Sequence, residues 1–137
     1  MSPAVLDASV ALAWCFPDEA SPRADRIWAA LAGRQVWVPA VWALEVANGM
    51  LAGERSRRIR AEDRERFLDL LAQFTVRVDA APLASLIAQV LPLARELNLS
   101  AYDAAYLELA LRLAGDLATL DQQLGKAGRR AGLALIV

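Results

Sequence analysis

The stretch from Ala4 to Cys15, AVLDASVALAWC, constrains the fold of this chain more than any other. A short apolar run, Ala4 to Leu6, ends at Asp7, and a second apolar run of helical length follows at once. This pattern predicts a buried strand that turns directly into a helix. Ligands bind at the carboxyl ends of the strands in parallel α/β sheets, so Asp7 is predicted to lie at a binding edge.

The rest of the chain alternates between helix and strand patterns. Strands are predicted at 4–6, 36–38, 75–78, 116–118 and 133–137. Helices are predicted at 9–15, 18–33, 40–52, a charged segment ending near 71, a segment opened by Pro82 and kinked or split by Pro92, 100–113 and 121–127. We interpret residues 1–137 as one domain, a three-layer α/β/α sandwich with a mainly parallel sheet and the first strand at its centre. The helix at 40–52 is apolar almost all round, so we expect it to be largely buried.

Composition narrows the chemistry that this chain can perform. With no histidine and a single cysteine, Cys15, it cannot build a Ser-His-Asp triad, a Cys-His pair or an ordinary structural zinc site. Catalysis would therefore rest on carboxylates, hydroxyls, amides, basic side chains or a bound metal ion. No apolar run reaches the roughly 18 residues of a membrane span, and the N-terminus has no signal-peptide pattern, so we expect a cytoplasmic protein without membrane contact.

Four acidic residues stand at positions that favour a shared site. Asp7 and Asp121 follow predicted strands, whereas Glu45 and Asp103 lie on apolar helices. Three of them have a plain structural interpretation, because Asp7 and Asp121 can cap helices and Asp103 fits a capping box with Ser100. Glu45 is different, since no Lys or Arg lies within one helical turn and a buried carboxylate needs a partner.

If these four carboxylates met, they would need a cation. Two carboxylates about 5 Å apart repel by roughly 3 kcal/mol at an effective dielectric of 20. A divalent cation relieves that repulsion, and oxygen ligands without His or Cys select Mg²⁺ or Mn²⁺ over zinc or copper. Such a cation can lower the pKa of a bound water, so these residues permit metal-assisted hydrolysis.

Four motifs resemble a known family in their order and spacing. They are LDAS (6–9), PAVWALEVAN (39–48), SAYDAAYLELA (100–110) and ATLDQQL (118–124). Together they resemble PIN domains, above all the toxin ribonucleases of VapBC-type toxin–antitoxin pairs. The resemblance implies Mg²⁺- or Mn²⁺-dependent cleavage of RNA, a homodimer, and a cognate antitoxin that inhibits the active site. It also implies an acidic metal site of Asp7, Glu45, Asp103 and Asp121, with Asp7 and Asp103 as the foremost direct ligands and with Ser9, Asn48 and Thr119 as supporting polar residues.

Two groups of basic residues are candidates for contacts with RNA phosphates: Arg55, Arg57, Arg58 and Arg60, and then Lys126, Arg129 and Arg130. Acidic residues surround the first group, which favours a solvated surface with ion pairs there. The formal net charge of -1 gives the whole molecule no positive field that would attract RNA. The hydrophobic content of 57%, with four tryptophans expected in the core or at an interface, predicts a homodimer.

Two other classes of protein share parts of the pattern. A receiver-type phosphoacceptor signalling domain has a similar length and would use Asp7, with Asp79 after the third strand. It also needs an acidic pair after the first strand and a lysine after the last, whereas Ala8 follows Asp7 and the only lysine, Lys126, precedes the last strand. A phosphatase with an aspartate nucleophile would need Asp-x-Asp, and Ser9 stands at the second position.

Overall fold

A single five-stranded parallel sheet organises the chain, and the computed structural model describes every residue from Met1 to Val137. The strands are β1 (Ala4–Leu6), β2 (Val36–Val38), β3 (Val76–Val78), β4 (Asp116–Ala118) and β5 (Leu135–Ile136). Their order is β3-β2-β1-β4-β5, and every neighbouring pair is parallel. The predicted central position of β1 is confirmed. The strand order reverses between β1 and β4, which is where α/β sheets bind ligands.

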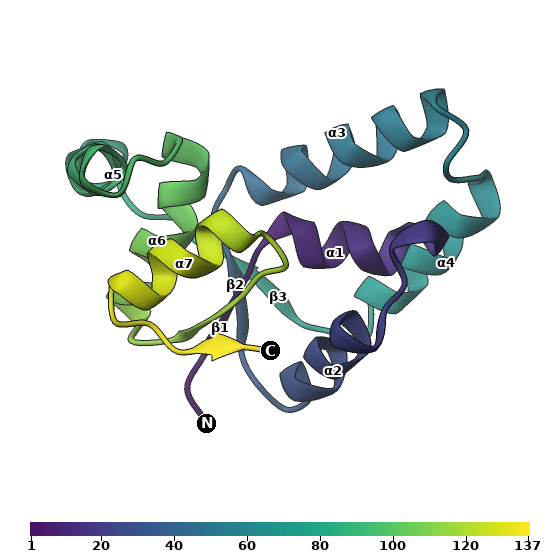
Figure 1. Ribbon diagram of the computed structural model, residues 1–137, viewed down its shortest axis with the longest axis horizontal. Coiled ribbons are helices and arrows are strands. Elements are labelled where there is room, and N and C mark those ends of the chain that lie inside the picture. The colour runs from purple at the N-terminus through teal and green to yellow at the C-terminus, as the bar shows by residue number, and fades with distance from the viewer.

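Seven α-helices flank this sheet (Figure 1). They are α1 (Ala8–Cys15), α2 (Pro22–Leu31), α3 (Trp42–Arg55), α4 (Ala61–Leu71), α5 (Leu83–Leu97), α6 (Ala101–Leu113) and α7 (Gln122–Arg130). A short 3₁₀ turn, η1 (Pro17–Glu19), joins α1 to α2. The predicted α/β class is therefore confirmed, with helices between successive strands as parallel connections require.

Two of the predicted helices differ from the structure. The segment predicted as one helix at 18–33 is broken after η1, and α2 begins at Pro22. Ser21 accepts a hydrogen bond from the Ala24 amide, and proline suits the first helical position, so this dipeptide starts a new helix. Pro92 does not split its segment, because α5 runs unbroken from Leu83 to Leu97 with the exposed proline inside it.

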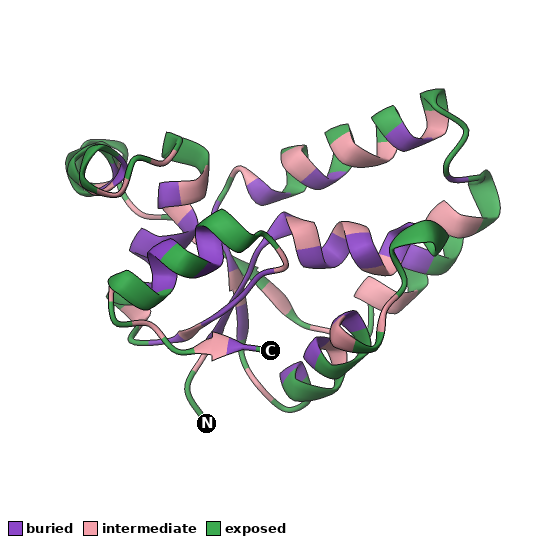
Figure 2. Ribbon diagram, in the orientation of Figure 1, coloured by how far each residue is buried: buried purple, intermediate pink, exposed green.

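The prediction that the third helix is largely buried is wrong. Only Trp42, Val46 and Gly53 of α3 are buried, and Leu44 is 72% exposed (Figure 2). The helix packs on α1 along one face, where a Cβ at Gly49 would lie only 2.6 Å from a Leu12 methyl carbon. Because this packing covers one face of α3 only, apolar residues on its opposite face are exposed to solvent.

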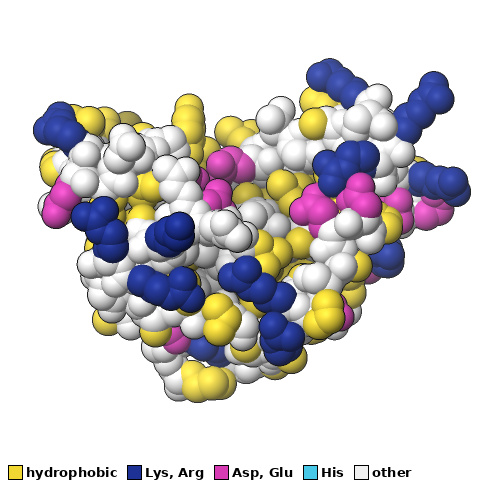
Figure 3. All heavy atoms as spheres, in the orientation of Figure 1, with side chains coloured by type: hydrophobic (Ala, Val, Ile, Leu, Met, Phe, Trp, Pro, Cys, Tyr) yellow, Lys and Arg dark blue, Asp and Glu magenta, His cyan; other side chains and the backbone are white.

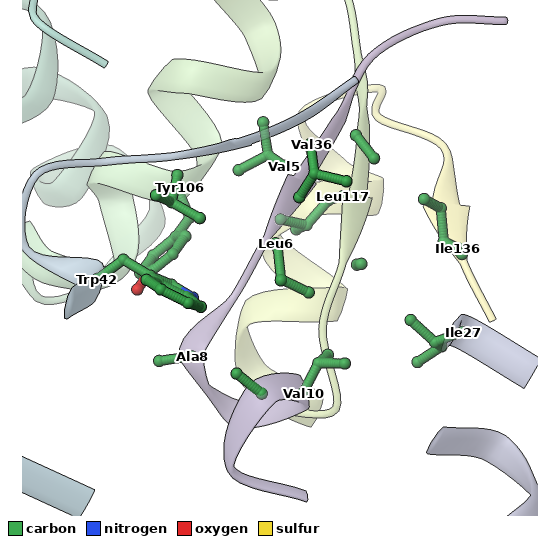
Figure 4. Packing of buried hydrophobic residues seen from close by; sticks show 14 of the residues in the cluster. Val5, Leu6, Ala8, Val10, Ile27, Val36, Trp42, Tyr106, Leu117 and Ile136 are labelled. Carbon is green, nitrogen blue, oxygen red and sulfur yellow. The ribbon is translucent and has the colours of Figure 1, made fainter. Parts of the chain in front are cut away.

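The core surrounds β1 and its two neighbouring strands. Val5, Leu6, Val36 and Leu117 are at most 1% exposed and meet side chains from the flanking helices (Figure 4). Burying an aliphatic side chain of this size contributes roughly 1.5–3 kcal/mol. Of the four tryptophans only Trp42 is buried, while Trp14, Trp28 and Trp37 are half-buried. No helix has both the length and the apolar character needed to cross a lipid bilayer.

Candidate active site at the carboxyl edge of the sheet

The four predicted acidic residues lie at the carboxyl edge of the central strands. Asp7 follows β1 directly, and Asp121 follows the adjacent β4 after two intervening residues. Glu45 lies in the first turn of α3 and Asp103 in the first turn of α6. Asp7, Asp121 and Glu45 all raise the pKa of the Asp103 carboxyl group by charge repulsion, so the four groups share one electrostatic environment.

Asp7 is held by hydroxyl groups. Its Oδ2 atom accepts hydrogen bonds from Ser9 Oγ at 2.6 Å and from Thr119 Oγ1 at 2.8 Å. The two hydroxyl oxygens in turn accept backbone N–H groups, Ser9 from Leu120 and Thr119 from Asp121. This arrangement ties the loop after β4 to the end of β1. Asp7 makes no side-chain cap to α1, so the capping interpretation of this residue is wrong.

Asp103 and Asp121 differ in their capping roles. Asp121 does cap α7, because its Oδ1 atom accepts the Leu124 amide at 3.1 Å. At α6 the cap is Ser100, whose hydroxyl accepts the amide of Asp103. The backbone amide of Ser100 does not donate to the Asp103 carboxylate, so the predicted capping box is only half formed. A hydrogen bond with the Ser100 side chain lowers the pKa of Asp103 slightly, and the carboxylate forms no ion pair.

Tyr106 is the site residue that sequence reasoning missed. Its hydroxyl donates a hydrogen bond to Glu45 Oε1, and the side chain is fully buried. Burial and this hydrogen bond raise the pKa of Tyr106, so the hydroxyl stays protonated and keeps donating. The available signal was its place three residues after Asp103, which puts both side chains on one face of α6. Glu45 is half-buried and has a protein partner.

Electrostatics at this edge favour the binding of a cation. Burial and the three neighbouring carboxylates raise the pKa of Asp103 to about 6. Burial also raises the pKa of Asp7, partly offset by the Ser9 and Thr119 hydrogen bonds. None of the four carboxylates forms an ion pair with Lys or Arg. The negative charge is therefore uncompensated by the protein.

The donor set fits a hard divalent cation that keeps part of its water. Every available ligand is a carboxylate or hydroxyl oxygen, as Mg²⁺ and Mn²⁺ prefer. No three acidic side chains stand close enough to hold one ion directly. Mg²⁺ commonly binds through one or two carboxylates and several waters, so it does not require three acidic side chains as direct ligands.

The other predicted residues fall into two classes. Asn48 is exposed, one turn after Glu45 on α3, and its side chain makes no hydrogen bond to the four carboxylates. In the first basic group Arg58 is paired with Asp18 and Glu19. The second group, Lys126, Arg129 and Arg130 on α7, is exposed and free of ion pairs.

Comparison with known proteins gives concordant similarities. The sequence pattern of the PIN domain family matches residues 4–130. Ribonuclease VapC3 of Pyrobaculum aerophilum is 31% identical over 122 residues, which cover 89% of this chain and 92% of that protein. The crystal structure of PAE2754 from Pyrobaculum aerophilum superimposes with a TM-score of 0.70 at 24% identity, covering 98% of this chain and 84% of that one.

Two further solved structures share the fold. FitAcB from Neisseria gonorrhoeae gives a TM-score of 0.66 at 17% identity, with 98% of this chain and 96% of that chain covered. A toxin–antitoxin complex from Klebsiella pneumoniae gives 0.57 at 19% identity, with 86% of each chain covered. At these identities the structural likeness establishes the arrangement of helices and strands.

Proposed function

The chain belongs to the PIN domain family, and on this basis we propose that it is a ribonuclease toxin of a toxin–antitoxin pair that uses Mg²⁺ or Mn²⁺. The observation that carries this proposal is the convergence of Asp7, Glu45, Asp103 and Asp121 at one edge of the sheet, without a basic partner. Membership of this family sets aside the receiver-type and phosphatase alternatives. All five strands join one sheet, so we propose that residues 1–137 act as one domain.

The proposed cation would be held by Asp7 and Asp103, with Glu45 and Asp121 around it. When bound, it would neutralise the carboxylates, polarise an RNA phosphodiester and lower the pKa of an attacking water. The Ser9 and Thr119 hydroxyls fix one oxygen of Asp7 and leave the other without a side-chain partner. Preorganised ligands of this kind need little rearrangement when the cation and substrate arrive.

Two carboxylates could orient the attacking water. Glu45 is positioned by the buried Tyr106 hydroxyl through a single oxygen, which leaves Oε2 available to accept a proton. Asp121 accepts the Leu124 amide of α7 at Oδ1, and its Oδ2 remains free at the exposed side of the site. A carboxylate within hydrogen-bond reach of a water can take its proton during attack on phosphorus.

The test of this activity is cleavage of RNA by the purified chain. We expect cleavage with Mg²⁺ or Mn²⁺ and none with excess chelator. The sharper probe is Asp103→Asn, which retains size but removes the charge. A metal-binding role predicts that cleavage falls by orders of magnitude while the free energy of unfolding stays equal or rises, because repulsion among carboxylates is relieved.

A matched control is Asp69→Asn on α4, which removes one exposed carboxylate away from any ion pair. This control should cleave RNA at the parental rate. An Asp103→Asn variant as active as the parent at saturating Mg²⁺ would contradict the proposed mechanism, and a parent that never cleaves RNA would overturn the function itself.

We also propose that the protein is a homodimer. Leu83, Ile87 and Leu91 of α5 are 79%, 63% and 53% exposed, and Tyr102 of α6 is 61% exposed. All of these except Leu83 line a cavity of about 280 Å³ whose lining is wholly apolar: Val41, Leu86, Ile87, Val90, Leu91, Ala101, Tyr102 and Ala105. A continuous apolar surface of this kind is typical of an interface, and a second copy offers the same surface in return.

Light scattering at micromolar concentration tests the dimer. We expect a dimeric mass for the parent and a monomeric mass for Ile87→Asp, because a charge in an apolar interface is costly to desolvate. Leu68→Asp on α4 is the control, since Leu68 is 53% exposed on a different helix. A monomeric parent, or dissociation by both substitutions alike, would speak against an interface at α5 and α6.

The remaining partner and the location are proposals from the same family membership. We propose a cognate antitoxin that inhibits the active site; a similar fold occurs in a toxin–antitoxin complex from Klebsiella pneumoniae. A gene for a short protein directly upstream, whose product forms a stable complex with this chain and stops RNA cleavage, is the expected finding. Cys15 lies buried as a free thiol, in keeping with the cytoplasm as the proposed location.

A further inference from the structure

Arginine side chains on the two sides of the carboxylate site differ in their ion pairing. On the α3–α4 side, Arg58 binds Asp18 and Glu19, and Arg64 binds Glu54. Their positive charge is therefore already compensated by neighbouring carboxylates. On the α2–α7 side no basic residue forms an ion pair. Arg55, Arg57 and Arg60 on the α3–α4 side form no ion pair either. Only the α2–α7 side, however, has an arginine that hydrogen bonds to the segment directly after β4.

Arg23 is the basic residue on this side that contacts the site. It lies in the first turn of α2, is half-buried, and donates a hydrogen bond from Nη2 to the backbone oxygen of Thr119 at 3.4 Å. Thr119 is the residue whose hydroxyl holds Asp7. The guanidinium thus stands at the carboxyl end of β4. Its other N–H groups have no carboxylate partner, and a guanidinium can bind phosphate with two parallel hydrogen bonds.

The α7 helix continues the positive charge away from the site. It begins directly after Asp121, and its exposed Lys126, Arg129 and Arg130 are spaced three and four residues apart, so they share one face. Figure 3 shows Lys and Arg side chains gathered over α7 and towards α2, on the face where acidic side chains appear in the central hollow. The exposed cations of α7 therefore continue from Arg23 and lead a phosphate chain away from the acidic centre.

We propose that the RNA strand leaves the carboxylate site over Arg23 and runs along the basic face of α7 formed by Lys126, Arg129 and Arg130. This inference rests on the proposed ribonuclease function and adds which surface binds the substrate. Arg23 binds a phosphate next to the scissile one, and the α7 face binds phosphates further along. Arg58 and Arg64 contribute little, because acidic residues neutralise them.

The salt dependence of RNA binding tests this path. Anisotropy of a labelled single-stranded RNA is measured with Ca²⁺ in place of Mg²⁺, in about 50 to 200 mM KCl, with gels confirming that the RNA stays intact. Each lost phosphate contact lowers the slope of log K against log salt by about 0.7 for a single strand. We expect the slope to fall by about 0.7 for Arg23→Gln. In a triple variant with Lys126→Gln, Arg129→Gln and Arg130→Gln, we expect it to fall by about 0.7 for each residue replaced.

Arg55→Gln is the matched control. It removes the same charge from an exposed residue without an ion pair at the end of α3, and its slope should equal that of the parent. A purely structural role of Arg23 would lower the melting temperature of Arg23→Gln and leave the salt slope unchanged. Arg23→Lys retains the charge and should keep the slope, and thermal melting verifies that each variant is folded.

The outcomes separate this inference from the function on which it rests. A parent that does not cleave RNA overturns the ribonuclease proposal, whatever the binding data. A parent that cleaves RNA while Arg23→Gln and the α7 variant keep the parental slope overturns the proposed path. Equal loss of slope in Arg55→Gln would also overturn it, since net charge alone would then govern binding. Loss of antitoxin binding with an unchanged RNA slope would assign the surface to the protein partner instead.

Discussion

Aspartates at the two edges of the sheet differ in their charged neighbours. At the amino edge, Asp116 begins β4 and pairs with Arg34, which also donates to the backbone oxygen of Ser2. At the carboxyl edge, Asp7 and Asp103 have other carboxylates nearby and form no ion pair with Arg or Lys. The pKa of Asp116 is lowered by Arg34, whereas the pKa of Asp103 is raised to about 6 by burial and repulsion.

The carboxylate at the amino edge stabilises the fold, whereas the carboxylates at the carboxyl edge remain available to a ligand. The Arg34 ion pair joins the N-terminal segment, the approach to β2 and the start of β4, so its energy contributes to folding. The carboxyl edge carries unfavourable repulsion in the protein alone. A bound cation would make the electrostatic energy of these carboxylates favourable. Perturbed pKa values tend to mark functional sites for this reason.

The largest expected effect is on catalysis at the carboxyl edge. Asp7→Asn should lower RNA cleavage by orders of magnitude, because the neutral amide is a weak ligand for a divalent cation. The free energy of unfolding in chelator should change by less than about 1 kcal/mol, since an asparagine oxygen can still accept from Ser9 and Thr119. Cleavage rates and denaturant unfolding measure both. A variant that loses stability but retains activity would remove the contrast between the two edges.

The next effect is on stability at the amino edge. Arg34→Ala should lower the free energy of unfolding by about 2 kcal/mol, because it leaves Asp116 without its cation and breaks hydrogen bonds to the N-terminal segment. Denaturant titration measures the loss, and RNA cleavage by the folded fraction should be unchanged. Arg95→Ala removes an exposed, unpaired arginine of α5 and should unfold like the parent.

A smaller effect is expected at Tyr106, which joins the core to the site. Tyr106→Phe removes the hydrogen bond to Glu45 and should cost about 1 kcal/mol of stability. Cleavage should fall several-fold, because Glu45 loses the contact that orients it. Full retention of the rate would mean that Glu45 needs no positioning. A loss as large as that of Asp7→Asn would instead give Tyr106 itself a role at the reacting phosphate.

The smallest effect concerns acid stability. The pKa of Asp116 in the folded state lies below its ordinary value of 3.8. Its contribution is therefore fully present above the unfolded pKa and is lost as pH falls through the folded pKa. Asp116→Asn should cost at most about 1 kcal/mol near neutral pH and make the acid limb of the unfolding profile shallower. An identical acid limb in parent and variant would exclude this ion pair as a contributor.

Local patterns in the sequence determined most helices and strands and the placement of Asp7 and Asp121 at one edge of the sheet. The run Ala4–Cys15 specified both β1 and α1, because an apolar triplet before an aspartate and a helical repeat allows few other structures. The same logic placed Asp7 and Asp121 at one edge, since parallel strands end together. The break at Ser21 and Pro22 was also encoded locally, although the prediction overlooked it.

Only the tertiary structure decided which partner each polar or apolar side chain meets. Asp7 is an apparent helix cap in sequence, yet its carboxylate turns to Thr119, more than a hundred residues away. Glu45 accepts a hydrogen bond from Tyr106 on a different helix. Helix α3 is apolar but largely exposed, because its main packing partner is α1 and covers only one of its faces. Periodicity reports which face of a helix is apolar. Whether that face is covered depends on where distant elements pack, and no local pattern carries that information.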